Sequence, residues 1–175
     1  MRARGFHGTT RRAAEAILRD GFKQSRNPFD WLGDGVYFFQ ESRTRAQMWA
    51  EEHAKGGEWA VIEADIDLDS CMDLLERPWS ELLAEAHDAV VAQHRRAGLR
   101  LPKQEGLAHG MDRLVINYAV GVLEDRGFHV ASVRAAFQEG SPAFPGSALF
   151  SLSHVQIAVS DASAIDVLGT DYGGA

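Results

Sequence analysis

The sequence predicts an α+β fold built from two small packed sheets with flanking helices. Apolar and polar residues alternate in the strand-like segments, most clearly over residues 59–68, as in strands with one covered face. Helical patterns interrupt these segments singly or in pairs, which favours an α+β arrangement. No G-x-G-x-x-G motif follows the first strand-like segment, so a doubly wound dinucleotide-binding sheet is not predicted.

Size and composition indicate one domain over residues 1–175, large enough to bury a core without disulfides or metal. No apolar run reaches the length of a membrane span and no signal-like segment follows the N-terminus, so we expect no membrane partner. Cys71 is the single cysteine, which favours a reducing, cytoplasmic location. The net charge of −7 argues against non-specific binding to nucleic acid. Arginines nevertheless gather beside the predicted site, at Arg2, Arg4, Arg11 and Arg12, and again at Arg43 and Arg45.

The first elements are a short strand and a helix. Residues 4–7 are typical of a strand, and Thr9 or Thr10 is a suitable N-cap for the helical pattern that follows. Gly21 ends this helix, because glycine readily takes the left-handed conformation usual at that position. Residues 22–35 form a long loop of turn-forming residues interrupted by aromatics, and loops of this length are usually functional.

A buried strand, a helix and a half-exposed strand come next. Residues 36–39 are an apolar run, and Ser42 or Thr44 can cap the helix after it. Glycines 56–57 stop that helix. Residues 59–68 then alternate, with Ala, Ile and Leu on the covered face and acidic residues outward.

The second half of the chain predicts two helices and two strands. The helices cover residues 78–98, with a proline in the first turn, and residues 110–126. The strands cover residues 128–137 and 154–159, and a loop rich in glycine, proline and serine separates them. We expect residues 170–175 to form a flexible tail.

Two motifs stand out near the N-terminus. Phe6-His7-Gly8-Thr9 ends the first strand, and Gly-x-Gly-Val-Tyr-Phe over residues 33–38 follows the long loop. In this order, with helical patterns between and after them, they resemble the ADP-ribosyltransferase superfamily, in the branch related to poly-ADP-ribose polymerases with its ordered His, Tyr and Glu signature. The resemblance is strong over residues 4–50, weaker over 128–168 and slight between. It implies an ADP-ribosyltransferase-like split β-sandwich with NAD in a cleft between the sheets.

His7, Gly8 and Thr9 form the first part of the implied NAD site. The resemblance implies that His7 hydrogen-bonds a ribose hydroxyl and that the backbone of Gly8 holds the nicotinamide carboxamide. A glycine suits that role, because without a Cβ a ligand can approach the backbone closely. A single histidine in a strand more often has a structural role. The motif around His7 is what favours a functional role here.

Tyr37 matches the second signature residue, whose ring stacks on nicotinamide, and Phe38 beside it is included in the cofactor site. Strand alternation puts Tyr37 and Phe39 on one face and Phe38 on the other. The alternative for Tyr37 is a core aromatic. The family usually supplies a second stacking ring from the next helix. Met48 falls at that position and Trp49 is next to it, so Trp49 belongs either to the site or to the core.

The third signature residue is normally a glutamate, and Gln156 is its best match. Alternation places Gln156 opposite the core face of its strand, where it faces a cleft or water. A glutamine can hydrogen-bond ribose but carries no charge and cannot act as a base, which favours single transfer over chain elongation. Glu139 lies in the preceding loop, which faces the acceptor in the family. It either deprotonates the acceptor or is an ordinary turn residue.

The resemblance therefore implies an NAD-dependent mono-ADP-ribosyltransferase with His7, Tyr37, Gln156 and Glu139 as catalytic residues. We expect the first three to line one cavity. NAD is the co-substrate, the acceptor is a protein, RNA or DNA, and an antitoxin is a possible partner by analogy with bacterial toxins. The alternatives are an NAD glycohydrolase and a catalytically silent NAD-binding module. The seven histidines contain no H-x-x-x-H or H-E-x-x-H, so no metal site is predicted.

Overall fold

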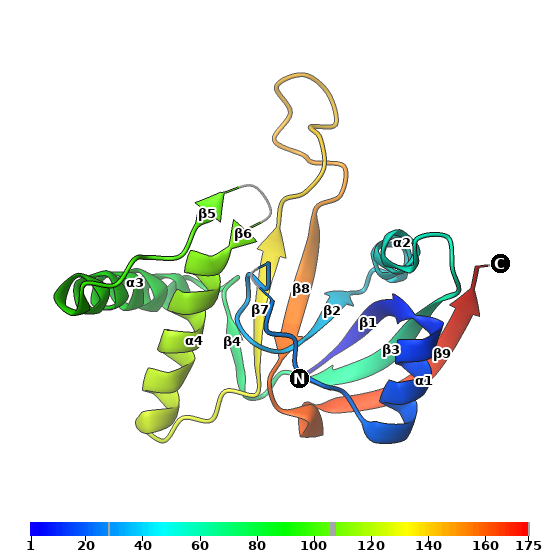
Figure 1. Ribbon diagram of the computed structural model, residues 1–175, viewed down its shortest axis with the longest axis horizontal. Coiled ribbons are helices and arrows are strands. Elements are labelled where there is room, and N and C mark those ends of the chain that lie inside the picture. The colour runs from blue at the N-terminus through cyan, green and yellow to red at the C-terminus, as the bar shows by residue number, and fades with distance from the viewer. Residues whose placement is uncertain (28, 106–107, 175) are drawn as a thin grey trace.

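The computed structural model describes residues 1–27, 29–105 and 108–174. Its elements are β1 (Arg2–Thr10), α1 (Arg11–Asp20), β2 (Val36–Gln40), α2 (Arg43–Ala54), β3 (Trp59–Asp67), β4 (Cys71–Asp73), α3 (Arg77–Ala97), β5 (Gln104–Glu105), β6 (Ala108–His109), α4 (Gly110–Asp125), β7 (Ser132–Phe137), β8 (His154–Val159) and β9 (Ile165–Gly173). Seven strands form one sheet in the order β4-β7-β8-β2-β1-β3-β9 (Figure 1), while β5 and β6 pair separately. Apart from the parallel pair β4 and β7, neighbouring strands are antiparallel. The predicted α+β class is confirmed.

Several local predictions are also confirmed. The side chain of Thr10 caps α1 by accepting a hydrogen bond from the N–H of Ala13 at 3.3 Å. Gly21 follows the helix with a φ of 84°, which a residue with a side chain rarely adopts. In β3, the predicted inward residues from Ala60 to Ile66 are buried.

The two halves of the sheet meet at a narrow seam between β1 and β2. Only two residue pairs join these strands, Gly5 with Gln40 and Phe6 with Phe39. By contrast, β1 pairs with β3 along its whole length. Beyond the seam the halves diverge, and Figure 1 shows β7 and β8 running at a steep angle to β1 and β3. The expectation of two separate sheets is corrected, because the hydrogen bonding continues through the seam.

Two apolar cores lie on opposite faces of the central strands. The first joins both halves of the sheet and consists of Ala3, Val36, Phe38, Ala64, Ile66, Leu68, Ile157 and Val159. The second lies under α3 and α4 and consists of Leu32, Met72, Ile116, Leu123, Val130, Val133, Ala135 and Ala158. Consecutive residues of β8, Ile157 and Ala158, point into different cores, as strand geometry requires. Strand β8 is therefore covered on both faces.

The C-terminal segment is not a flexible tail in its described part. Thr170 to Gly173 complete β9 and pair with β3, Thr170 opposite Ile62 and Gly173 opposite Trp59. A Cβ on Gly173 would lie 2.3 Å from the Trp59 ring, so the glycine permits this close packing. This segment lacks a clear apolar alternation, so its strand conformation comes from pairing with the edge of β3. Residue 175 lies outside the described residues.

The strand predicted over residues 128–137 is shorter than expected, since β7 begins at Ser132. No helix in the described ranges combines the length and the apolar character needed to cross a membrane.

Candidate functional site

Gly8 lies in β1 just beyond the last residue pair that joins β1 to β2. In an antiparallel ladder, alternate residues direct their N–H and C=O groups to opposite neighbours. The N–H of Glu41 donates to the carbonyl of Arg4 at 2.9 Å, and the N–H of Arg11 donates to the carbonyl of Glu58 at 3.0 Å. Even-numbered residues of β1 therefore point toward β2, and odd-numbered ones toward β3. By this alternation, the peptide groups of Gly8 face β2.

Gly8 has no strand partner on that side. The pairing of β1 with β2 ends at Phe6 and Phe39, so the next pair, Gly8 with Tyr37, does not form. The carbonyl of Tyr37 instead accepts a hydrogen bond from Nδ1 of His7 at 2.9 Å. Gly8 is buried, and the strand pair with Tyr37 that would take up its N–H and C=O is missing. Buried backbone groups are rarely left unpaired, so this peptide edge offers one donor and one acceptor to a ligand.

The missing side chain of Gly8 serves packing between a helix and a strand. A Cβ at this position would come within 2.0 Å of the carbonyl oxygen of Ala46 in α2. The expectation that the missing Cβ opens space for a ligand is therefore corrected. The free surface of Gly8 is its peptide edge toward β2, and the space beside its Cα is occupied by α2.

His7 lies on the face of β1 opposite to this helix. Its Nδ1 bonds to a carbonyl, which can only accept, so Nδ1 carries the proton and Nε2 keeps a lone pair. Burial lowers the pKa of His7, and the hydrogen bond to Tyr37 opposes that shift in part. The ring packs against Phe22 and Phe38, with centroids 5.5 and 5.7 Å away. The imidazole is therefore neutral near pH 7 and offers an acceptor.

A cavity of about 250 Å³ opens beside His7. Its other lining residues are Ala13, Ala16, Ile17, Asp20, Gly21, Phe22 and Lys23, from α1 and the turn after it. The cavity wall is largely apolar, with one acidic and one basic side chain and the imidazole of His7. It can hold a small ligand that has an apolar body and a hydroxyl group for His7.

The hydroxyl of Tyr37 is engaged by the loop that precedes β2. It accepts from the N–H of Leu32 at 2.9 Å and donates to the carbonyl of Gly33 at 2.8 Å. Burial is the main cause that raises the pKa of Tyr37, so the phenol stays protonated. Because the hydroxyl is used within the protein, a ligand contact by Tyr37 falls to its ring.

Gln156 is oriented by Trp31, which the sequence analysis did not select. The indole N–H of Trp31 donates to Oε1 of Gln156 at 2.6 Å. An indole N–H can only donate, so this bond fixes the orientation of the amide and leaves the two N–H groups of Nε2 available. Trp31 also packs on Phe137, with ring centroids 4.5 Å apart. The only sequence signal for Trp31 was an aromatic in a long polar loop.

A cluster of Arg45, Glu139 and the buried His154 lies next to Gln156 on the same face of β8. Arg45 in α2 binds the Glu139 carboxylate at 2.7 Å, and its guanidinium lies 5.3 Å from the centre of the Phe39 ring. Nδ1 of His154 donates to the carbonyl of Leu152 at 2.7 Å and lies 3.8 Å from the same carboxylate. Burial chiefly lowers the pKa of His154, so the ring is neutral near pH 7.

Two nitrogen atoms of this cluster are buried without a hydrogen-bond partner among the described residues, Nε of Arg45 and Nε2 of His154. Glu139 is not an unpaired turn residue, because Arg45 holds its carboxylate, and its side chain stays 39% exposed. Sequence reasoning identified Glu139 but did not pair it with Arg45, 94 residues away in α2, or with His154 at the start of β8.

The other three predicted cofactor residues are Phe38, Trp49 and Thr9, and within the described residues none is held by a hydrogen bond to the groups described above. Phe38 is fully buried in the first core, so its inclusion in the cofactor site is wrong. Trp49 packs in a separate cluster and stacks on His53 with centroids 3.9 Å apart, which favours its core alternative. Thr9 lies on the face of β1 that carries His7. Met48 is exposed on α2 near Arg45.

The predicted residues do not line one cavity as expected. Directly opposed residues on paired strands share a face, so the register places His7 with Phe38 and Gly8 with Tyr37. His7 therefore faces away from Tyr37 and Gln156, and neither of these lines the cavity beside His7. The hydrogen bond from His7 to the Tyr37 carbonyl connects the two sides at the seam.

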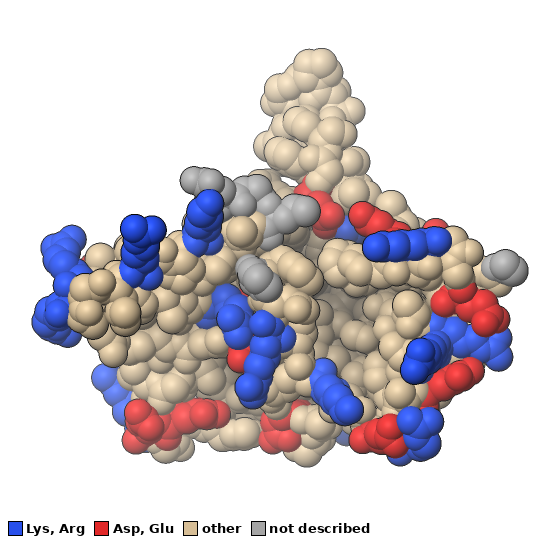
Figure 2. Space-filling view, viewed as in Figure 1, with Lys and Arg blue, Asp and Glu red and all other residues tan. Residues whose placement is uncertain are grey.

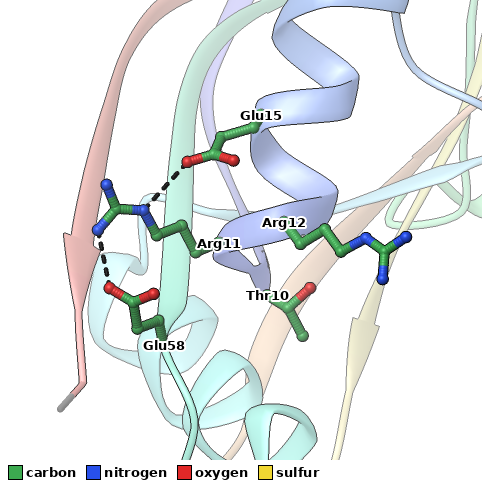
Figure 3. Close-up of a pocket in the computed structure, with 5 residues that line it drawn as sticks. All are labelled: Thr10, Arg11, Arg12, Glu15 and Glu58. Atoms are coloured by element: carbon green, nitrogen blue, oxygen red, sulfur yellow. Dashed lines mark hydrogen bonds and ion pairs between the residues drawn. The ribbon is translucent and has the colours of Figure 1, made fainter.

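A second depression, of about 310 Å³, lies at the start of α1 and is lined by Thr10, Arg11, Arg12, Glu15 and Glu58 (Figure 3). Arg11 bridges the two carboxylates, at 3.1 Å from Glu15 and 2.8 Å from Glu58, while Arg12 points away from them. These exposed ion pairs account for its polar character, and it is separate from the residues around Gln156.

In the described parts of the chain, no three His, Cys, Asp or Glu side chains are grouped to hold a metal ion. The sequence matches no model of a known protein family, and a search of curated proteins finds no similar chain.

Proposed function

We propose that this protein is an NAD-dependent mono-ADP-ribosyltransferase with an ADP-ribosyltransferase-like split β-sandwich fold, and that NAD binds at the β1–β2 seam. The observation that carries this proposal is the buried peptide of Gly8, which faces β2 just beyond the point where the pairing of the two strands ends. A nicotinamide carboxamide carries a C=O acceptor and an N–H donor side by side, so it can bond to the N–H and the C=O of one residue as a neighbouring strand would. Its carbonyl would accept from the Gly8 N–H, and its amide would donate to the Gly8 carbonyl, which replaces the strand pair that the seam leaves open.

Groups on both sides of the seam would hold the rest of the dinucleotide. The ring of Tyr37 shares a face with Gly8 and would stack on the nicotinamide. On the opposite face, Nε2 of His7 would accept a hydrogen bond from a hydroxyl of the other ribose of NAD, and the cavity of about 250 Å³ beside it would take that sugar. Because the Gly8 peptide faces β2 beyond the last strand pair, a ligand bound to it would lie between β1 and β2, within reach of both faces.

The proposed reaction breaks the bond between ribose C1′ and the nicotinamide nitrogen. Nicotinamide leaves with the bonding electrons, the ribose passes through an oxocarbenium-like state, and an acceptor nucleophile attacks the opposite face and loses a proton. Gln156 would donate from Nε2 to a ribose oxygen and so fix the sugar. With an amide at this position, catalysis would depend on positioning and strain in NAD more than on a charged partner. Glu139 is the proposed acceptor of the proton.

One observation favours a second candidate, a catalytically silent NAD-binding module. Gln156 carries no charge and is already bound by Trp31, and the carboxylate of Glu139 is paired with Arg45. In this arrangement, the developing positive charge on the ribose would have no free carboxylate from these two residues. A role as a cytoplasmic toxin or defence effector with an antitoxin is a further hypothesis, taken from analogy with the family.

The test is incubation of the purified protein with NAD labelled in its adenosine part, with and without cell extract. We expect release of nicotinamide and transfer of label to macromolecules, which protease and nuclease digestion then identify. NAD binding without nicotinamide release would support the silent module, and release without labelled macromolecules would support an NAD glycohydrolase. A protein that neither binds NAD in calorimetry nor releases nicotinamide would overturn the proposal.

A further inference from the structure

The turn that carries Trp31 is held between the sheet and α4. This turn, residues 31–34, lies in the long loop before β2, and Ser25 and Gly35 close that loop by exchanging backbone hydrogen bonds at 2.8 and 3.3 Å. On the side of the sheet, the hydroxyl of Tyr37 binds two backbone groups of the turn. On the other side, the turn contacts α4, which belongs to the part of the chain with only slight resemblance to the ADP-ribosyltransferase superfamily. The contact with α4 is therefore a feature that the motifs near the N-terminus do not include.

The carboxamide of Asn117 in α4 binds Asp34 of this turn twice. Its Oδ1 accepts from the N–H of Asp34 at 3.0 Å, and its Nδ2 donates to Oδ1 of Asp34 at 3.0 Å. The same peptide group, between Gly33 and Asp34, accepts at its carbonyl from the Tyr37 hydroxyl. A Cβ on Gly33 would lie 2.5 Å from Oδ1 of Asn117, so the turn and this side chain are in close contact. Asparagine fits the position, because its amide has a donor and an acceptor side by side.

Arg113 adds a charged contact to the same carboxylate. It lies four residues before Asn117, so both side chains project from one face of α4. Nε of Arg113 donates to Oδ1 of Asp34 at 2.7 Å, and Arg26 of the loop lies 3.5 Å from the other oxygen. Figure 2 shows basic side chains gathered where the loop passes α4. The Arg113 and Asp34 side chains are 30% and 26% exposed, so this charge-assisted hydrogen bond is partly shielded from water.

We propose that Asn117, supported by Arg113, is a positioning residue of the candidate site, which fixes the turn and thereby keeps the Trp31 indole on Gln156. This inference rests on the proposed function. Trp31 lies three residues before Asp34, and its indole N–H donates to Oε1 of Gln156 at 2.6 Å. If the turn shifts, this bond is lost and the amide of Gln156 is free to rotate, so that Nε2 no longer points to the ribose. A group that is present but misplaced lowers the reaction rate even though the substrate still binds.

The experiment exchanges the two polar groups of this contact. Asn117→Asp removes the donor and places a second carboxylate beside that of Asp34. The double variant Asp34→Asn/Asn117→Asp restores one donor and one carboxylate, which Arg113 can still bind from one helical turn away. Val115→Ala is the control for stability, because Val115 is buried among residues of α3 and α4. For each protein, kcat and KM of nicotinamide release from NAD are measured together with thermal unfolding. If Asn117→Asp does not fold, Asn117→Ala, which removes both bonds without adding charge, replaces it.

We expect Asn117→Asp to lower kcat by about tenfold or more with little change in KM, as for a displaced catalytic group. The double exchange should return kcat close to the wild-type value. Val115→Ala should keep its kcat although its unfolding temperature falls. The decisive comparison uses Gln156→Ala as the background. There Asn117→Asp should cause little further loss of kcat, because its effect passes through Gln156.

Three results would overturn the inference and leave the proposed function intact. One is a wild-type kcat in Asn117→Asp. Another is a loss of kcat that is equally large with and without the side chain of Gln156. The third is a similar loss of kcat in Val115→Ala, which would show that Asn117 acts through stability alone. A wild-type protein that neither releases nicotinamide nor binds NAD would overturn the proposed function, and this inference with it.

Discussion

Val36 and Phe38 on one face of β2 pack into a core made of apolar side chains, whereas Tyr37, on the other face, is held by hydrogen bonds. On this second face the neighbouring strand adds Gln156, bound by Trp31, and the cluster around Arg45. Apolar contacts only stabilise, but buried polar groups reduce stability unless each is paired. The comparison indicates that the first face of β2 is held by apolar packing, whereas the second combines an apolar core with fixed hydrogen-bonding groups.

The largest effect is expected for Phe38→Ala, which tests whether apolar packing on the first face stabilises the fold. The side chain is fully buried in the first core, so its removal should lower the free energy of unfolding by about 3–5 kcal/mol. Urea unfolding followed by circular dichroism measures this loss. A loss below about 1 kcal/mol, the usual range of a mild substitution, would show that the first face is not the stabilising core.

Gln156 tests the polar face. Gln156→Ala should lower the rate of nicotinamide release by roughly ten- to a thousandfold, the range for loss of one positioned hydrogen-bonding group. Gln156→Glu should keep or raise NAD hydrolysis, because a carboxylate can still accept from Trp31 and adds negative charge near the developing cation. Steady-state kinetics at saturating NAD provides the measurement. Unchanged turnover in Gln156→Ala would remove this residue from the site and leave Glu139→Gln as the next variant.

Gly8→Ala tests the seam between β1 and β2. The new methyl group would clash with the carbonyl of Ala46, so we expect a loss of about 1–3 kcal/mol in the free energy of unfolding. We also expect weaker NAD binding, because α2 and the Gly8 peptide must shift. Gly121→Ala in α4 is the control, since its Cβ would meet no atom within 4 Å. Normal NAD affinity in Gly8→Ala would separate this peptide from the ligand.

Two substitutions of Tyr37 distinguish the role of its ring from that of its hydroxyl. Tyr37→Phe leaves the N–H of Leu32 and the carbonyl of Gly33 without their partner, which should cost about 1–3 kcal/mol of stability. Its NAD affinity should change little. Tyr37→Ala should in addition weaken NAD binding by about 1 kcal/mol or more, through loss of the stacking face. Calorimetric titration with NAD distinguishes the two variants, and equal affinity in both would contradict stacking.

The smallest expected effect is a pH dependence that involves both faces. Burial lowers the pKa values of His7 and His154 from their ordinary value of 6.5. Between the lowered and the ordinary pKa, the unfolded chain binds more protons than the folded one, so stability rises with pH through that window. Stability should therefore be complete above the ordinary value and decline as the pH falls below it. Urea unfolding from pH 8 to pH 5 measures this trend, with pH values chosen about the histidine range.

The variant His7→Asn tests how much of this pH dependence of stability comes from His7. In His7→Asn the side-chain N–H can still donate to the carbonyl of Tyr37, but the group no longer titrates. The decline of stability toward low pH should become shallower. An identical slope in the variant would mean that His7 does not contribute to it.

The sequence by itself determined the features that depend on neighbouring residues. The cap at Thr10, the turn at Gly21 and the alternation of β3 were predictable, because each depends on a local hydrogen bond, a local dihedral angle or the strand period. The α+β class followed from the same patterns, and so did the positions of His7 and Tyr37 on strands, although β1 is longer than the predicted residues 4–7.

The tertiary structure decided everything that depends on which strands and helices meet. Local patterns could not show that pairing of β1 and β2 stops after Phe6, so the free peptide of Gly8 and the opposite faces of His7 and Tyr37 became visible only in the fold. Trp31 is 125 residues from Gln156 in the chain, and Arg45 is 94 residues from Glu139. Contacts at such separations follow from strand order and helix packing, because no local propensity encodes which distant segments pack together.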